Sequence, residues 1–193
     1  MEKGKGTLNN LPIGKFYIKE TKTGDSFVLD PKEQDFEITY QGQEVAVDYV
    51  TKEIKNQRQK VEIEVLKRSE ATKEPLAGVS FGLYAGEDLL NAAGEIVVKK
   101  DELVAVGKTD EEGKLKYQDT IPHGKYYLKE LENLPGYLPF EEKIEIDASY
   151  TDPKLEVISI QKEVENQPTK VEITKTDITG EKEVEGAKLQ ILD

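Results

Sequence analysis

Residues 59–67 read Gln-Lys-Val-Glu-Ile-Glu-Val-Leu-Lys, and apolar residues alternate with charged ones along this stretch. Successive side chains of a β-strand point to opposite faces, so Val61, Ile63 and Val65 share one face. The next residue on that apolar face is Lys67. Because an isolated ammonium in an apolar core is very costly, Lys67 has to be paired, neutralised or consumed by chemistry.

Five further residues end an apolar stripe in the same way. They are Lys175 after Val171 and Ile173, Glu130 after Tyr126 and Leu128, Glu20 after Phe16 and Ile18, Asn166 after Val164, and Asn56 after Ile54. One interpretation is that each is an edge residue that reaches solvent where its strand leaves the core. The other is that a lysine, a glutamate and an asparagine meet inside the protein. The recurrence of all three types favours the second interpretation.

The chain contains internal repeats. Residues 11–20 match residues 121–130 at a shift of 110 (121 − 11), and Lys67 matches Lys175 at a shift of 108 (175 − 67). Such self-similarity is typical of repeat architectures. We therefore predict the C-terminal part of one repeat in residues 1–58, a complete repeat in residues 59–168, and the first strands of a third in residues 169–193.

Short apolar-alternating segments separated by turn signals predict an all-β sandwich. The least regular part of the complete repeat is residues 85–103, where residues 88–93 could form a short helical turn. The formal net charge of −12 argues against nucleic acid as a partner, and no apolar run approaches the 18 residues of a membrane span.

Composition also limits the chemistry. Cysteine is absent and His123 is the single histidine, so we expect no metal site, no cofactor and no histidine-based triad. No signal peptide is visible, since Met1 is followed by Glu-Lys-Gly-Lys-Gly, and we expect the chain to be an internal piece of a longer protein.

Three stretches carry a resemblance to a known family. They are Val65-Leu66-Lys67 with Pro75-Leu76-Ala77-Gly78-Val79-Ser80-Phe81-Gly82-Leu83-Tyr84, Gly124-Lys125-Tyr126-Tyr127-Leu128-Lys129-Glu130 with Gly136-Tyr137, and Val164-Glu165-Asn166. The chain resembles the Cna protein B-type, or SpaA-type pilin, domains, which are prealbumin-like β-sandwiches of Gram-positive surface adhesins and pili. This resemblance implies an inverse Ig-like fold, with one complete copy flanked by two partial copies.

The resemblance also implies roles for three residues. In the family, a lysine of the first strand bonds covalently to an asparagine of the last strand, assisted by a buried glutamate. Lys67, Asn166 and Glu130 match those positions. Pro135 sits one place later than the family's proline, and the Gly-Tyr pair is missing after Glu20, which departs further from the pattern.

The chemistry suits these residue types. Burial favours the unprotonated amine, which is the nucleophile, and the neutral carboxylic acid. Glu130 could then donate a proton to the amide oxygen and pass it to the departing ammonia. The product would be a Lys67–Asn166 isopeptide bond made once per molecule, so we expect self-modification and no enzyme. A prealbumin-like hydrolase is the enzymatic alternative, which the lack of histidines disfavours.

The leading hypothesis is a structural stalk module of an extracellular, cell-wall-anchored adhesin or pilin. The rival is a module that binds a host matrix protein, with Tyr127, Tyr137, Phe140 and Tyr150 as candidate aromatic contacts. Expected partners are adjacent repeats of the same protein.

The ends of the chain allow a further interaction. Residues 1–58 contain Glu20 and Asn56 without a lysine strand, whereas residues 169–193 contain Lys175 without either partner. Head-to-tail self-association could therefore bring Lys175 of one chain to Asn56, near Glu20, of the next. The alternative is that both ends are disordered and the chain stays monomeric.

Overall fold

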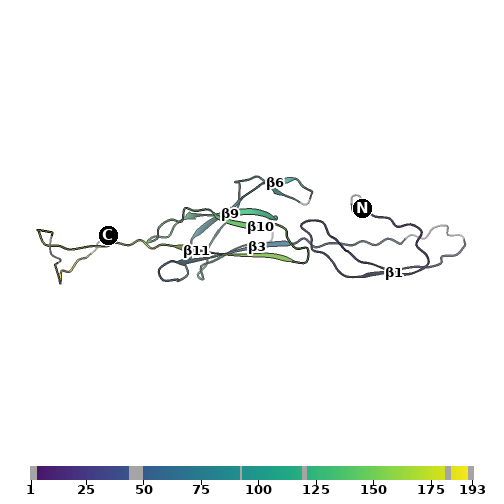
Figure 1. Ribbon diagram of the computed structural model, residues 1–193, viewed down its shortest axis with the longest axis horizontal. Helices are drawn as coiled ribbons and strands as arrows, with labels where there is room; N and C mark the ends of the chain where they lie inside the picture. The colour runs from purple at the N-terminus through teal and green to yellow at the C-terminus, as the bar shows by residue number, and fades with distance from the viewer. Residues whose placement is uncertain (1–3, 44–49, 92, 119–120, 181–183, 191–193) are drawn as a thin grey trace.

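The computed structural model describes residues 4–43, 50–91, 93–118, 121–180 and 184–190. Every regular element among these residues is a β-strand, as predicted. The described residues contain no helix that is long and apolar enough to cross a membrane. The molecule is elongated, with a central sandwich between an N-terminal arm and a C-terminal segment (Figure 1).

Two sheets form the sandwich. One sheet has the strand order β10-β9-β4-β7, and the other has the order β11-β3-β8. The first contains β4 (Ser80–Ala85), β7 (Leu103–Lys108), β9 (Gly124–Glu132) and β10 (Ile144–Ala148). The second contains β3 (Lys60–Ser69), β8 (Lys114–Tyr117) and β11 (Val157–Asn166). Their facing apolar side chains form one core.

Strand β3 follows the alternation of its sequence. Val61, Ile63 and Val65 are at most 2% exposed, and Lys67 is 0% exposed on the same face. The strand lies between β8, which runs antiparallel, and β11, which runs parallel to it. In the parallel pair Lys60 lies opposite Val157 and Ser69 lies opposite Asn166, so the two strands start and end together.

The N-terminal arm repeats part of the sandwich. Strands β1 (Gly14–Ile18) and β2 (Gln34–Ile38) pair antiparallel, with Gly14 opposite Ile38 and Ile18 opposite Gln34. Adding 110 to these numbers gives the pairs of β9 and β10, Gly124 with Ala148 and Leu128 with Ile144. The matching strands β1 and β9 thus pair with their neighbours in the same register, although the division of the chain into one complete and two partial repeats stays a prediction.

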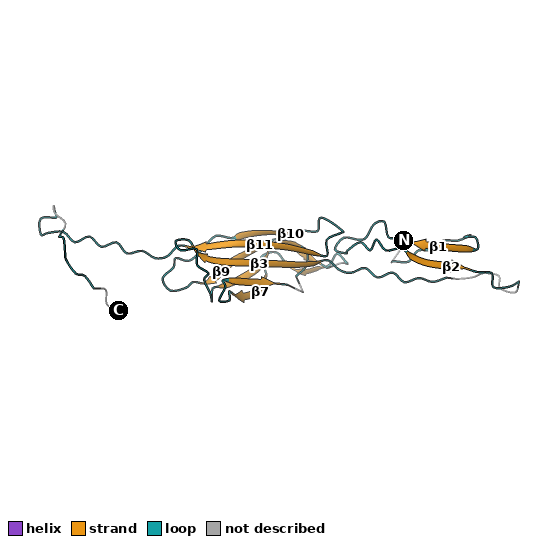
Figure 2. Cartoon of the chain, turned by 90° about the horizontal axis from the view of Figure 1, so that it is seen from below, coloured by secondary structure: helices purple, strands orange, loops and turns teal. Residues whose placement is uncertain are grey.

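The described part of the C-terminal segment, unlike the N-terminal arm, adds no named strand to a sheet. Among the described residues after Asn166, none belongs to a named strand, and the chain runs away from the sandwich at the end opposite the N-terminal arm (Figure 2). Val171 and Ile173 are 73% and 55% exposed. Without a second strand and a core to pack against, the β3-like sequence forms no named strand here.

The predicted helical turn in residues 88–93 is wrong. Residues 89–90 form the short strand β5 (Leu89–Leu90), which pairs with β6 (Ile96–Val98), while residue 92 lies outside the described residues. Gly94 has a φ of 81° in the connecting turn, a conformation that suits glycine. Leu89 is 1% exposed in the core, so packing holds this segment as a hairpin.

Candidate isopeptide site

Lys67, Glu130 and Asn166 meet between the two sheets. The Lys67 ammonium lies 2.9 Å from Glu130 Oε2 and donates a hydrogen bond to Asn166 Oδ1. Asn166 Nδ2 donates to Glu130 Oε1 at 2.9 Å and to Oε2 at 3.2 Å. Each of the three side chains therefore contacts the other two.

The strands explain how residues so far apart in sequence meet. Lys67 and Asn166 are separated by 99 residues but lie near the same end of the parallel pair β3–β11, where Val164 is opposite Lys67. Glu130 comes from β9 in the other sheet, where it pairs with Phe81 of β4. The trio thus links the two layers of the sandwich.

None of the three side chains reaches solvent. Lys67 is 0% exposed, the Glu130 side chain 2% and Asn166 2%. The rings of Phe81 and Phe140 lie 5.5 and 5.4 Å from the Lys67 nitrogen, which is a cation–π distance. Burial lowers the pKa of Lys67, and the contact with Glu130 opposes that shift without cancelling it.

The orientation of the Asn166 amide follows from donor and acceptor chemistry. An ammonium can only donate, so it faces Oδ1, and the amide Nδ2 then faces the carboxylate oxygens. The sequence argument expected Glu130 to donate a proton to the amide oxygen. In this arrangement Glu130 instead contacts the amide nitrogen, which is the atom that leaves if Lys67 attacks the carbonyl carbon.

The sequence also matches a known protein family. A family model described as the SpaA prealbumin-like fold domain matches residues 1–53 and 61–163. The chain belongs to this SpaA family. The prealbumin-like fold that the family resemblance implied is therefore confirmed. A search of curated proteins found no match.

Several solved structures resemble the chain. The Bacillus anthracis TIE protein is 28% identical, with a TM-score of 0.63, and the match covers 87% of this chain but 28% of that one. BcpA, the major pilin subunit of Bacillus cereus, is 23% identical over 58% of this chain and 31% of that chain, with a TM-score of 0.38.

The group B streptococcus pilus 2b backbone protein is 18% identical over 85% of this chain and 53% of that one, with a TM-score of 0.43. Because both pilin scores are low, neither likeness carries a conclusion about this chain. The SpaA-family chain spans less than a third of the length of TIE and of BcpA.

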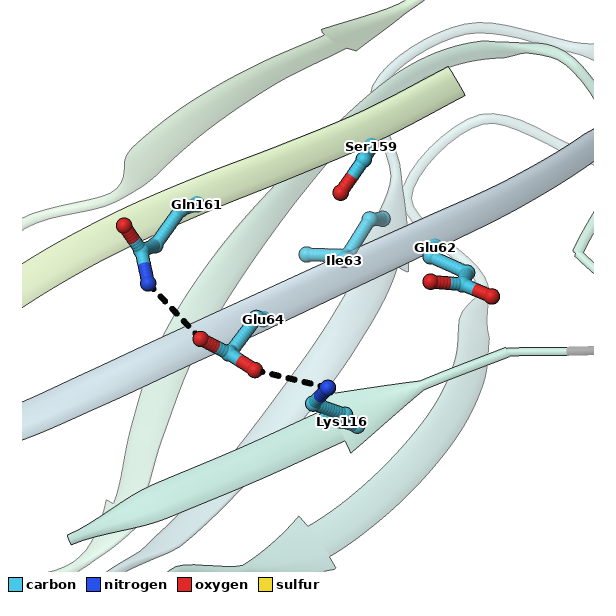
Figure 3. Close-up of a pocket in the computed structure, with 6 residues that line it drawn as sticks. All are labelled: Glu62, Ile63, Glu64, Lys116, Ser159 and Gln161. Carbon is cyan, nitrogen blue, oxygen red and sulfur yellow. Dashed lines mark hydrogen bonds and ion pairs between the residues drawn. The ribbon is translucent and has the colours of Figure 1, made fainter. Parts of the chain in front are cut away.

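The outer face of the SpaA-type sandwich provides an internal contrast. There, Glu64 of β3 accepts a hydrogen bond from Gln161 of β11 at 2.7 Å and pairs with Lys116 of β8 at 2.9 Å (Figure 3). Like the buried trio, this surface group combines a carboxylate, an amine and a carboxamide. Its lysine side chain, however, is 56% exposed.

The pKa values of the two lysines, Lys67 and Lys116, are shifted in opposite directions. The hydrogen bond to Glu64, followed by the charge of Glu64, raises the pKa of Lys116, so its amine stays protonated. Burial lowers the pKa of Lys67 and favours the nucleophilic form. Residue type alone therefore does not make a reactive site, and the difference lies in burial.

Sequence reasoning missed one polar residue of the site. Asn133 Oδ1 accepts a hydrogen bond from Asn166 Nδ2 at 3.2 Å, and Asn133 Nδ2 donates to the Tyr137 carbonyl at 2.5 Å. Asn133 follows β9 in a loop and belongs to no apolar stripe, so period-two patterning could not select it.

The four aromatic side chains considered as ligand contacts all make packing or ring contacts within the chain. Phe140 and Tyr137 pack against the core, and Tyr127 is 7% exposed with its ring 5.2 Å from that of Tyr84. Tyr150 makes an edge contact with the ring of His123.

The N-terminal arm contains a second carboxylate–amide pair. Asn56 Nδ2 donates to Glu20 Oε1 at 2.6 Å, to Glu20 Oε2 at 2.8 Å and to Thr23 Oγ1 at 2.8 Å. The backbone N–H of Asp30 also donates to Glu20 Oε2, at 2.9 Å. Lys175 lies in the exposed C-terminal segment, so the structure does not bring it to this pair.

In the described part of the chain, no group of three or more His, Cys, Asp or Glu side chains could hold a metal ion. The buried trio brings an amine, a carboxyl group and a carboxamide into contact.

Proposed function

We propose that this chain is a load-bearing stalk module of a Gram-positive surface adhesin or pilus, stabilised by a self-made bond between Lys67 and Asn166. The observation that carries the proposal is the fully buried contact of Lys67, Glu130 and Asn166. Membership in the SpaA family and the elongated form of the molecule support the structural role.

The reaction begins with a proton transfer. Lys67 and Glu130 lie 2.9 Å apart in a site without solvent, where two separated charges are poorly stabilised. Moving one proton from the ammonium to the carboxylate gives a neutral amine and a neutral acid. The amine can then act as a nucleophile toward the Asn166 side-chain carbonyl carbon.

The second stage breaks the original carbon–nitrogen bond of the Asn166 amide. Glu130 contacts Nδ2 at 2.9 Å and can return its proton to that nitrogen as the tetrahedral species collapses. Lys67 starts with three protons on nitrogen and retains one. The leaving nitrogen departs as ammonia with one proton remaining on Glu130, or as ammonium with the carboxylate restored. The residues are consumed, so there is no turnover.

The position of the bond suits a load-bearing role. The chain enters the sandwich at the start of β3 and leaves it at the end of β11, and the flanking segments extend in opposite directions (Figure 1). A link between Lys67 and Asn166 carries tension directly from one strand to the other. The segment between these two residues, which are 99 positions apart in the sequence, would then be unable to extend under force.

Intact mass and single-molecule force measurements test the proposal. The purified chain should be lighter than its sequence by one ammonia, and Lys67→Ala, Asn166→Ala or Glu130→Ala should restore the full mass. Lys116→Ala is the matched control, because it removes the exposed lysine of the surface group and should leave the ammonia loss intact.

Under force the Lys67→Ala chain should lengthen by on the order of 300 Å more than the wild type, because the released segment extends by about 3.3–3.6 Å per residue. A wild-type chain with the unmodified mass would overturn the chemistry. Equal extension of the two chains would overturn the load-bearing role.

A further inference from the structure

Strand β7 differs in charge from the other edge strands of the sandwich. It is the last strand of the four-stranded sheet and lies at the margin of the sandwich (Figure 2). Residues 103–107 read Leu-Val-Ala-Val-Gly and carry no charge, whereas the edge strands β8, β10 and β11 each carry two or more charged residues. Charged side chains on an edge strand hinder its pairing with another chain. Strand β7 lacks this protection.

Apolar side chains are exposed around the same edge. Leu103 and Val106 are 51% and 55% exposed, and Ile96 and Val97 of β6 are 54% and 50% exposed. Val97 and Leu103 line one hollow, so the exposed apolar surface continues from β7 to β6. We call these four residues the β7 patch. Contiguous apolar surface of this kind marks sites of interaction.

Unpaired charges of opposite sign flank the β7 patch. Lys99 and Lys100 precede β7, and Asp110 and Glu111 follow it. Among the residues that the structure describes, none of these four side chains forms an ion pair. Lys100 lies six residues before Val106 (106 − 100) and Glu111 lies five residues after it (111 − 106). The two charged groups are therefore at similar distances from the middle of β7.

The other charges close to β7 have partners within the chain. Asp101 lies 3.8 Å from the Lys143 ammonium, and Lys108 pairs with Glu132 at 2.9 Å. The Glu102 side chain accepts a backbone N–H of its own turn at 3.0 Å. The charge left without a partner is thus positive at the start of β7 and negative after its end.

We propose that β7 is a lateral interface between two copies of this chain, paired antiparallel about a two-fold axis near Val106. This arrangement places the start of each β7 beside the end of the other. Lys99 and Lys100 of each copy then face Asp110 and Glu111 of the other, and the same contact occurs twice. The net charge of −12 opposes association of two copies, so the match of charges has to be local.

The regular part of β7 allows the two backbones to pair. The register with β4 skips Val104, so β7 is regular from Ala105 to Lys108. With Val106 opposite its counterpart, Ala105 lies opposite Gly107, and the side chains on each face of the sheet match. Every second residue of an edge strand points its N–H and C=O away from its single neighbour. Pairing of these groups would join the two four-stranded sheets into one.

Charge reversal in the full-length chain tests the proposal. Because the contact is small, the wild type should form a weak, reversible dimer in sedimentation equilibrium over a concentration series up to about 1 mM. Lys99→Glu with Lys100→Glu makes both flanks acidic, and Asp110→Lys with Glu111→Lys makes both flanks basic. Each double variant alone should dimerise at least about tenfold more weakly. Their 1:1 mixture should form a heterodimer, since acidic flanks then meet basic ones.

Two further variants separate the local contact from net charge. Lys154→Glu with Lys170→Glu changes the net charge as much as reversal of Lys99 and Lys100, but both residues are exposed and lie outside the β7 patch. This control should dimerise like the wild type. Val106→Asp should abolish the dimer, and circular dichroism should show a folded chain, because Val106 is 55% exposed.

Three results would overturn the proposal. A wild type that stays monomeric over the whole series would leave the β7 patch to another occupant, such as an extended apolar peptide that adds to the same edge. A dimer that persists in both charge-reversed variants and in Val106→Asp would place the contact elsewhere. A mixture that fails to restore the dimer would exclude the antiparallel arrangement. These measurements do not depend on the bond between Lys67 and Asn166, so the two proposals can fail separately.

Discussion

The pairs Glu130–Asn166 and Glu20–Asn56 have the same hydrogen bonds in different surroundings. The first lies in a closed sandwich beside Lys67, and the second lies in an arm with a single hairpin and no lysine contact among the described residues. Asn166 is 2% exposed, whereas Asn56 is only partly buried. The comparison shows that local sequence is sufficient to align the acid with the amide, but the amine and the apolar cover come from distant strands.

Replacing Glu130 or Glu20 should give the largest difference between the sandwich and the N-terminal arm in the free energy of unfolding that is lost. Glu130→Ala should prevent the cross-link, whose closure of a long loop is worth about 4–5 kcal/mol by chain-entropy reasoning. Glu20→Ala should cost only about 1 kcal/mol, because it removes hydrogen bonds in a partly exposed site. Chemical denaturation monitored with intact mass measures both effects.

Glu132→Ala is the control for the glutamate pair, since Glu132 forms an exposed ion pair with Lys108. If Glu130→Ala and Glu20→Ala unfold at the same denaturant concentration, the contrast between the closed and open sites is wrong.

The equivalent residues Leu128 and Ile18 sharpen the contrast in packing. Leu128 is 0% exposed, so Leu128→Ala should cost about 2–5 kcal/mol from lost burial and the cavity left behind. Ile18 lies at the corresponding position in the arm but is only partly buried, and Ile18→Ala should cost less than about 1 kcal/mol. Urea denaturation of the two variants makes the comparison. Equal costs would mean that the arm has a core as closed as that of the sandwich.

The pH dependence of stability tests the buried amine. In Asn166→Ala the bond cannot form, so Lys67 remains titratable with a pKa that burial holds below its ordinary value of 10.5. Between the lowered pKa and 10.5 the unfolded chain binds a proton that the folded chain does not. Stability should therefore rise with pH across that window, with a slope of at most about 1.4 kcal/mol per pH unit.

The matched control for this measurement is Lys67→Met in the same Asn166→Ala chain, which should remove the rise. A slope that persists in the double variant would assign the pH dependence to another group.

Removing the hydrogen bond that Asn166 makes to Asn133, or that Asn56 makes to Thr23, should change stability least. Asn133→Ala and Thr23→Ala each remove one hydrogen bond to an asparagine amide, which is worth about 0.5–1.5 kcal/mol. The ammonia loss should persist in both, because Lys67, Glu130 and Asn166 keep their mutual contacts. A full-length mass without ammonia loss in Asn133→Ala would place this residue among the groups that the reaction requires.

The sequence by itself determined which faces carry the reactive residues. Strand geometry has a period of two, so Lys67, Glu130 and Asn166 had to continue the apolar stripes that precede them. The shift of 110 residues likewise predicted that residues 1–58 contain part of the repeat seen in residues 59–168, since the turn and the alternation in the matching stretch are local properties. The recurrence of the three residue types and the family resemblance supplied the expectation that these residues meet.

Only the tertiary structure decided how those faces are brought together. The parallel pairing of β3 with β11 closes a long loop and depends on packing across the whole sandwich, which no local pattern specifies. The same packing brought Asn133 to the amide, enclosed Lys67 between Phe81 and Phe140, and held Leu89 and Leu90 in a hairpin where local sequence allowed a helical turn. Backbone periodicity is set residue by residue, whereas burial, and with it the lowered pKa of Lys67, exists only once both sheets are in contact.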